Sequence, residues 1–116
     1  IDLGRVSDKA QALMAYFLTL FDTLPCRNEF ELITPTEPEK RGNQLAFRHP
    51  RSFAICQALI DAGVIGDFRA PDVLRLGFSP LLLSFADMDK AVNNIACIMS
   101  EQRYLKPVYQ QKSLVT

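Results

Sequence analysis

The chain has 116 residues, of which 48% are hydrophobic and 22% charged, a composition typical of one globular domain with a modest core. Thirteen basic side chains balance thirteen acidic ones, so the basic excess typical of nucleic-acid-binding proteins is absent. No apolar run reaches the roughly 20 residues of a membrane span, and the cysteines show no CxxC spacing, so we expect neither a membrane segment nor a metal site.

An amphipathic helix is predicted at residues 7–24. Ser7 is a good N-cap and Pro25 cannot continue a helix, so these residues mark its expected ends. The hydrophobic residues that recur at helical spacing are Ala10, Leu13, Met14, Phe17, Leu18, Phe21 and Leu24. A stripe of this width needs a partner, and packing against a protein core is far commoner than lying on a membrane.

Two strands and a second helix follow. Residues 30–33 and the alternating residues 44–48 each predict a strand. Residues 50–62 predict a helix that ends at Gly63, because glycine is favoured where a helix terminates in a left-handed conformation. The residues expected on the inner side of this helix are Phe53, Cys56, Leu59 and Ile60.

The second half of the chain predicts two more strands and a third helix. Val64-Ile65 is expected to form a very short strand, and Gly66-Asp67 a turn. Residues 73–78 alternate and predict the next strand. A helix is then expected to open at Phe85 and to run over residues 85–101.

This order of elements is typical of the α+β class, with a small, mostly antiparallel sheet and helices packed on one face. We predict one domain at residues 1–103, which includes the leading helix. Residues 104–116 show no clear period and are predicted to be a partly disordered tail. The chain begins at Ile1 with neither an initiator Met nor the layout of a signal peptide, which favours a segment of a longer protein.

One arginine stands in the middle of the apolar strand at residues 73–78. The side chains expected to face the core are Leu74, Leu76 and Phe78. Arg75 then projects from the opposite face, which the helices leave uncovered. Because a guanidinium can hold a carboxylate through two parallel hydrogen bonds, Arg75 is a candidate carboxylate-binding residue. Judged from the residues alone, a solvated arginine or one paired with a local acid such as Asp67 or Asp72 is the commoner outcome.

The stretch that contains Arg75 resembles a segment near the C-terminus of kynureninases. The similar runs are Gly63-Val64-Ile65-Gly66-Asp67-Phe68-Arg69-Ala70-Pro71-Asp72, Leu74-Arg75-Leu76-Gly77-Phe78 and Ser79-Pro80-Leu81. Upstream, Arg41-Gly42-Asn43-Gln44-Leu45 is similar to the family's Arg-Gly-x-Gln run. The resemblance covers about residues 5–100. One departure is Leu82, where the family often has a tyrosine, and it bears on the preference for a 3-hydroxyl group.

The resemblance implies the C-terminal small domain of a fold-type I pyridoxal-phosphate enzyme. Kynureninases are hydrolases that convert L-kynurenine or 3-hydroxykynurenine to an anthranilate and L-alanine in tryptophan catabolism, on the route to NAD biosynthesis. In that family the arginine corresponding to Arg75 binds the substrate's α-carboxylate. The implied partners are a large N-terminal domain that binds pyridoxal phosphate, the amino-acid substrate, and a second subunit in a cytoplasmic homodimer.

No lysine of this chain lies in a sequence that resembles the family's cofactor-lysine region, and no glycine-rich phosphate cradle is visible. We therefore expect no catalytic or cofactor-binding residue here, and the chain alone should be inactive. Two alternatives remain at this point: the small domain of another fold-type I enzyme, such as an aminotransferase or cysteine desulfurase, or a non-catalytic α+β binding module. His49, the only histidine, is expected to be solvated or to cap a helix rather than to act as a base.

Overall fold

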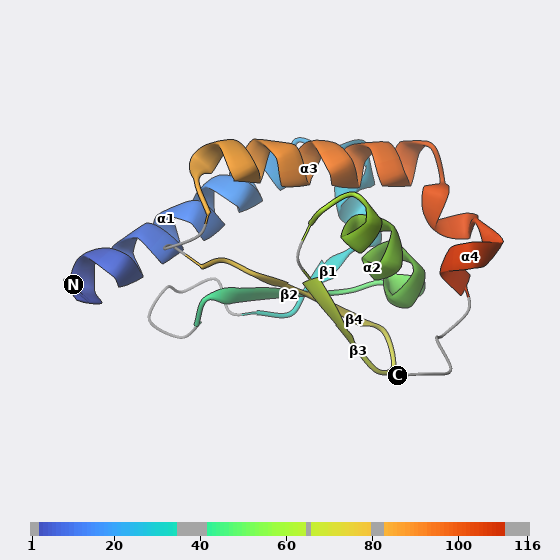
Figure 1. Cartoon of the computed structure of the whole chain (residues 1–116), viewed down its shortest axis with the longest axis horizontal. Helices are drawn as coiled ribbons and strands as arrows, with labels where there is room; N and C mark the ends of the chain where they lie inside the picture. Colours follow the sequence, from blue (N-terminus) through green and yellow to red (C-terminus); the bar gives the residue numbers. More distant parts are fainter. Residues whose placement is uncertain (1–2, 35–41, 65, 80–82, 111–116) are drawn as a thin grey trace.

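The computed structural model describes residues 3–34, 42–64, 66–79 and 83–110. Helices cover one face of a sheet that has four strands in these residues (Figure 1). The helices are α1 (Leu3–Phe21), α2 (Ser52–Asp61), α3 (Phe85–Ser100) and α4 (Pro107–Gln110), with the 3-10 helices η1 (Pro25–Glu29) and η3 (Arg103–Leu105). The predicted α+β fold is confirmed. Within the described part of the chain, no helix has the length and apolar character that crossing a bilayer requires.

The sheet is antiparallel throughout. Its strands are β1 (Glu31–Leu32), β2 (Gln44–Arg48), β3 (Gly66–Arg69) and β4 (Val73–Gly77), in the spatial order β1-β2-β4-β3. Ala46 of β2 and Asp67 of β3 both lie directly opposite Arg75 of β4. Since paired residues of neighbouring strands point to the same face, these three side chains form a row across the sheet.

The other face of the sheet forms the floor of the core. Its central side chains, Leu45, Phe47, Leu74 and Leu76, are at most 3% exposed. Phe17, fully buried on α1, packs against Phe21, Phe47 and Phe78 with ring-centroid distances between 5.2 and 6.3 Å. The alternation predicted for the strand at residues 73–78 is therefore confirmed.

The predicted helices were wrong in detail: α1 ends at Phe21 rather than Leu24, and α2 begins at Ser52 rather than Pro50. Helix α1 begins at Leu3, so Ser7 is an exposed residue inside the helix and not its N-cap. The hydrophobic spacing continues upstream through the half-buried Val6, which explains the earlier start. On α2, Ile60 is exposed, whereas the buried residues are Ser52, Ala54, Ile55, Cys56, Ala58 and Leu59. This helix contacts β3, β4, α3 and η3, and therefore buries a wider surface than a single stripe.

Strand β3 also differs from the prediction. Gly66 and Asp67, expected to form a turn, are its first residues, and Ile65 lies outside the described residues. Gly66 faces the core, where an added Cβ would come within 3.0 Å of the Arg75 carbonyl oxygen and of Leu76 Cδ2. The glycine thus permits close packing of β3 on β4 rather than a reversal of the chain.

The end of α2 carries a left-handed glycine, as predicted. Gly63 has φ +88°, and an added Cβ there would meet no atom within 4 Å. We expect Gly63→Ala to lower the free energy of unfolding by about 1–2 kcal/mol through backbone strain alone. Gly77→Ala is the matched control, since its Cβ would also meet open space and no positive φ is involved. Equal urea midpoints for the two variants would contradict this prediction.

The segment after α3 continues to pack on the domain as far as residue 110. Tyr104 is buried in the core, and α4 contacts both α2 and η3. Residues 111–116 lie outside the described residues. The domain boundary after residue 103 stays a prediction, and the burial of Tyr104 favours a boundary further along the chain.

Candidate carboxylate-binding site

Arg75 lies at the middle of β4, on the face of the sheet away from the helices. Its neighbour on β2 is the small Ala46, and two residues along β4 Gly77 has open space where a side chain would be. The Arg75 side chain is 26% exposed. A small planar anion can therefore approach this part of the face.

Asp67 holds the Arg75 guanidinium in a bidentate pair. Arg75 Nε–H donates to Asp67 Oδ1 at 2.9 Å, and Nη2–H donates to Oδ2 at 2.7 Å. The hydrogen bond from Arg75 lowers the pKa of Asp67, and the same hydrogen bond raises the pKa of Arg75. Both groups are therefore charged at neutral pH. The pairing with a local acid that the residues alone favoured is present, and Asp67 is the acid.

This pair uses one edge of the guanidinium. Arginine has five N–H donors, and the two bonds to Asp67 occupy the Nε–Nη2 edge. Within the described residues, no hydrogen bond is made by Nη1, which borders the second edge. The Nη1–Nη2 edge can accept another carboxylate in the same bidentate geometry. Such a site can bind and orient an anion, and neither Asp67 nor Arg75 would move a proton at neutral pH.

A second cluster of charges lies on the same face. Arg48 forms ion pairs with Asp72 at 3.3 Å and Glu31 at 3.5 Å. Asp72 is therefore paired with Arg48, whereas Arg75 is paired with Asp67. Arg69, on β3, contributes a positive charge that also lowers the pKa of Asp67.

His49 is buried and lies among aromatic residues, so the expectation of a solvated side chain was wrong. Its ring centroid is 4.8 Å from that of Phe30 and 6.2 Å from that of Tyr104. The capping role is supported, because Nδ1 accepts a hydrogen bond of 2.9 Å from the Arg51 N–H just before α2. Burial lowers the pKa of His49, and Glu29, with an oxygen 3.7 Å from Nε2, opposes this effect only in part.

The buried histidine predicts a loss of stability on mild acidification. Because the folded-state pKa lies below the unfolded value of about 6.5, the unfolded chain binds the proton more readily. The free energy of unfolding should fall as the pH drops below about 6.5, by at most about 1.4 kcal/mol per pH unit. Urea unfolding at several pH values measures this slope. His49→Gln should flatten it, since the chain has no other histidine.

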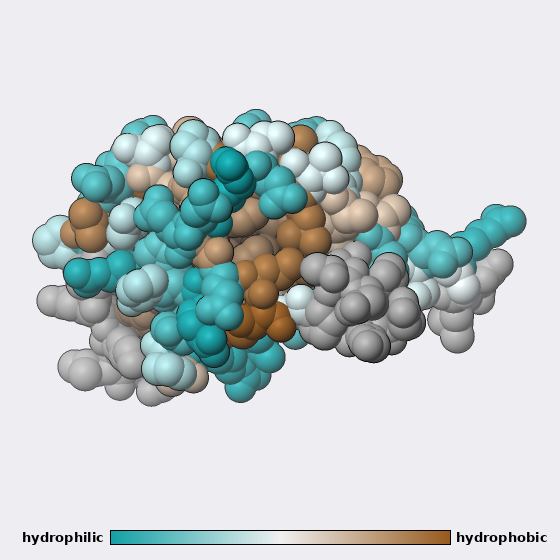
Figure 2. Space-filling view, turned by 180° about the vertical axis from the view of Figure 1, so that it is seen from behind, coloured by the Kyte–Doolittle hydropathy of each residue, from teal (hydrophilic) through white to brown (hydrophobic). Residues whose placement is uncertain are grey.

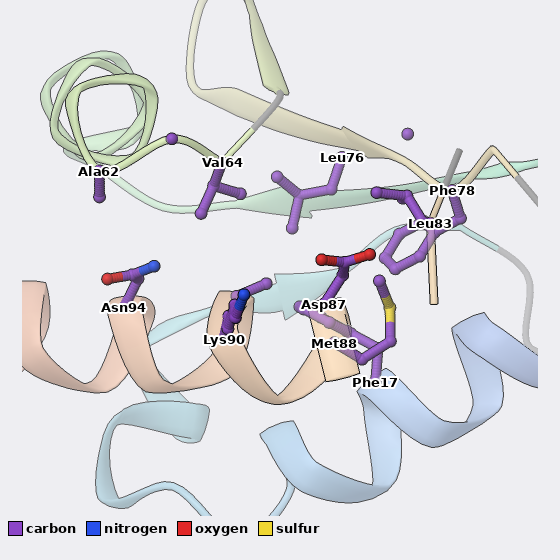
Figure 3. A pocket seen from close by; sticks show the side chains of 13 residues that line it. Phe17, Ala62, Val64, Leu76, Phe78, Leu83, Asp87, Met88, Lys90 and Asn94 are labelled. Atoms are coloured by element: carbon purple, nitrogen blue, oxygen red, sulfur yellow. The ribbon is translucent and has the colours of Figure 1, made fainter. Parts of the chain in front are cut away.

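A pocket of about 170 Å³ lies between the end of α2, β4 and α3. Figure 3 shows Asp87, Lys90 and Asn94 of α3 facing Val64 and Leu76 across it. Asp87 is already engaged, because its carboxylate accepts bonds from the Ser84 N–H at 2.8 Å and the Ser84 hydroxyl at 3.1 Å. These hydrogen bonds lower the pKa of Asp87 and cap α3. The spacing of Ser84 and Asp87 resembles a capping box and could have been read from the sequence.

The comparison with known proteins decides between the alternatives. The family described as the kynureninase C-terminal domain matches residues 6–95. The chain belongs to this family. This assignment confirms the resemblance found at residues 63–81 and favours a kynureninase domain over the small domain of an aminotransferase or a cysteine desulfurase. Leu82, the departure noted in that stretch, lies outside the described residues.

Several kynureninases match this kynureninase domain over most of its length. That of Deinococcus radiodurans is 41% identical over 101 residues, which are 87% of this chain and 25% of that protein. That of Pseudomonas fluorescens is 36% identical over 115 residues, 99% of this chain and 28% of that protein. A Burkholderia mallei kynureninase is 35% identical over the same length. The chain thus spans about a quarter of the length of the curated relatives it matches.

Kynureninase family membership implies pyridoxal phosphate in the full enzyme, but the described residues do not fit that cofactor. The lysine at the pocket, Lys90, is an exposed residue beside Asp87. The carboxylate of Asp87 occupies the start of α3, where a phosphate group would otherwise be favoured. The same carboxylate is bonded to Ser84 and is not available to a pyridine nitrogen. That the chain alone binds no cofactor stays a prediction.

Proposed function

We propose that this chain is the C-terminal small domain of an enzyme that hydrolyses L-kynurenine or 3-hydroxykynurenine. The products would be anthranilate or 3-hydroxyanthranilate and L-alanine, as the family resemblance implies. The observation that carries the proposal is Arg75, an arginine fixed on the sheet face away from the helices in a chain that belongs to the kynureninase C-terminal domain family. In the proposed enzyme, Arg75 binds the α-carboxylate of the substrate.

The role of Arg75 would be to orient the substrate. Two parallel hydrogen bonds to a carboxylate fix both its position and its plane, so that the amino group and the carbon chain of the substrate point in a defined direction. Holding a reactant in this way removes rotational freedom before the reaction begins. The chain would contribute binding and orientation, whereas the catalytic groups and the cofactor would come from a large N-terminal domain of the same enzyme.

The surface of the chain supports contact with a further part of the protein. Figure 2 shows hydrophobic residues gathered in the middle of one face, with hydrophilic residues to their left. Apolar patches of this kind commonly mark interaction sites. The proposal includes a large N-terminal domain, a homodimeric enzyme and a cytoplasmic location. The three free cysteines, Cys26, Cys56 and Cys97, are compatible with a reducing compartment.

The full-length protein tests this proposal directly. It should be expressed from the complete gene, loaded with pyridoxal phosphate and incubated with L-kynurenine and, separately, with 3-hydroxykynurenine. We expect an anthranilate and L-alanine to appear in equal amounts, detected by fluorescence and by amino-acid analysis. Consumption of substrate without release of alanine would indicate another reaction, and no consumption of either compound would refute the proposal.

A further inference from the structure

The register of β3 against β4 places Asp67 and Arg75 next to each other. The two residues lie directly opposite each other on β3 and β4, and their side chains leave the same face. Both oxygens of Asp67 are used, at 2.9 and 2.7 Å from Arg75 Nε and Nη2. Two contacts of this kind fix the position of the guanidinium and also the orientation of its plane.

We propose that Asp67 is a positioning residue for substrate binding: it holds Arg75 by the Nε–Nη2 edge and thereby presents the Nη1–Nη2 edge to the carboxylate of an amino-acid substrate. This inference rests on the proposed function, in which Arg75 binds that carboxylate. Asp67 itself does not touch the substrate and acts only through Arg75.

Ordering Arg75 before the substrate arrives favours binding. A free arginine side chain has many rotamers, and a ligand that must select one of them loses affinity. Because Asp67 already holds Arg75 in one rotamer, the substrate loses little affinity by ordering this side chain. Arg69, two residues along β3, adds a second positive charge that acts on Asp67 and lowers its pKa. An incoming carboxylate is therefore attracted although Asp67 is negative.

Asp67 could instead compete with the substrate for Arg75, and the KM would then change in the opposite direction when Asp67 is removed. If Asp67 only competed with the substrate for Arg75, its removal would free the guanidinium and delete a repulsive negative charge. The KM for the substrate would then fall. If Asp67 positions Arg75, its removal lets the guanidinium rotate, and the KM rises in spite of the lost repulsion. The direction of the change in KM separates the two roles.

The test is Asp67→Ala in the full-length enzyme, with L-kynurenine as substrate. We expect the KM to rise roughly 10-fold, with a smaller change in kcat, because a positioning residue acts on binding before it acts on chemistry. In an Arg75→Ala background, Asp67→Ala should cause no further change, which a general loss of structure would not reproduce. Asp67→Glu, which keeps the carboxylate, should restore part of the affinity.

Asp72→Asn is the matched control. Asp72 lies on the same part of the sheet and is paired with Arg48 at 3.3 Å, so this variant breaks a similar ion pair without affecting Arg75. Its KM should equal that of the unmodified enzyme, and the thermal midpoints of all variants should confirm that they are folded. An unchanged or lower KM for Asp67→Ala overturns the inference alone. If Arg75→Ala also leaves the KM unchanged, or the unmodified enzyme does not turn over kynurenine, the proposed function fails with it.

Discussion

Replacing Arg75 by alanine in the full-length enzyme is expected to reduce kcat/KM for L-kynurenine by about 100-fold or more, with the content of pyridoxal phosphate unchanged. The variant removes two charge-assisted hydrogen bonds to the substrate carboxylate, each worth roughly 1.5–3 kcal/mol. A loss of about 3 kcal/mol corresponds to more than a factor of 100. Steady-state kinetics and the absorbance of the bound cofactor measure the two quantities on the same preparation.

Two further variants show whether the geometry of Arg75 or only its charge matters. Arg75→Lys keeps the positive charge but cannot bind Asp67 and a second carboxylate by two planar edges, so most of the loss should persist. Arg48→Ala removes an arginine from the same face, where it is paired with Asp72 and Glu31, and should change kcat/KM by less than about 3-fold. Normal kinetics for Arg75→Ala would contradict a role for Arg75 in binding the substrate.

Replacing Phe17 by alanine is expected to cost about 3–5 kcal/mol of the free energy of unfolding. Phe17 is fully buried and contacts Phe21, Phe47 and Phe78, so it joins α1 to β2 and to the residue after β4. Its removal leaves a cavity that several rigid neighbours cannot fill. Because a domain of this size has a total stability of about 5–15 kcal/mol, urea unfolding should show a much lower midpoint.

Phe85→Ala makes the same chemical change at an exposed position. Phe85 has one edge-to-face contact with Tyr16, at a centroid distance of 5.4 Å. The substitution should therefore lower the free energy of unfolding by no more than about 1.5 kcal/mol. If both variants lost similar amounts of stability, Phe17 would not be the centre of the core, and the packing of α1 on the sheet would need revision.

The central strands were predictable because alternation alone determines them. Residues 44–48 were predicted as a strand with the observed bounds, and the side of the sheet on which Arg75 lies followed from the leucines on either side of it. Strand β3 was missed because Gly66-Asp67 has the composition of a turn. In the structure, Asp67 and Arg69 face outward while Gly66 and Phe68 face the core, so the same residues do alternate. Local sequence does not distinguish a glycine in a turn from a glycine that makes space for a neighbouring strand, because the position of that strand is not known from the sequence.

Parts of the site depended on distant contacts and could not be read from local sequence. Asp67 and Asp72 were both reasonable partners for Arg75, and only the register of β3 against β4 decides for Asp67. The burial of His49 results from Phe30 and Tyr104, which precede and follow it by many residues. Likewise, the pair with Asp67, and not either residue alone, determines which edge of the guanidinium forms no hydrogen bond within the described residues.

The strand order also has a consequence for how the domain folds. Asp67 and Arg75 are eight positions apart in one hairpin, whereas β2 joins β4 through pairs such as Ala46 and Arg75, with α2 and β3 between them in the chain. Closing the longer loop costs roughly 1 kcal/mol more conformational entropy than closing the hairpin. The hairpin should therefore form early, before the central strand pair. The charged pair that would meet the substrate would then be assembled from local sequence, whereas the hydrophobic face beneath it would be completed later, through contacts between distant parts of the chain.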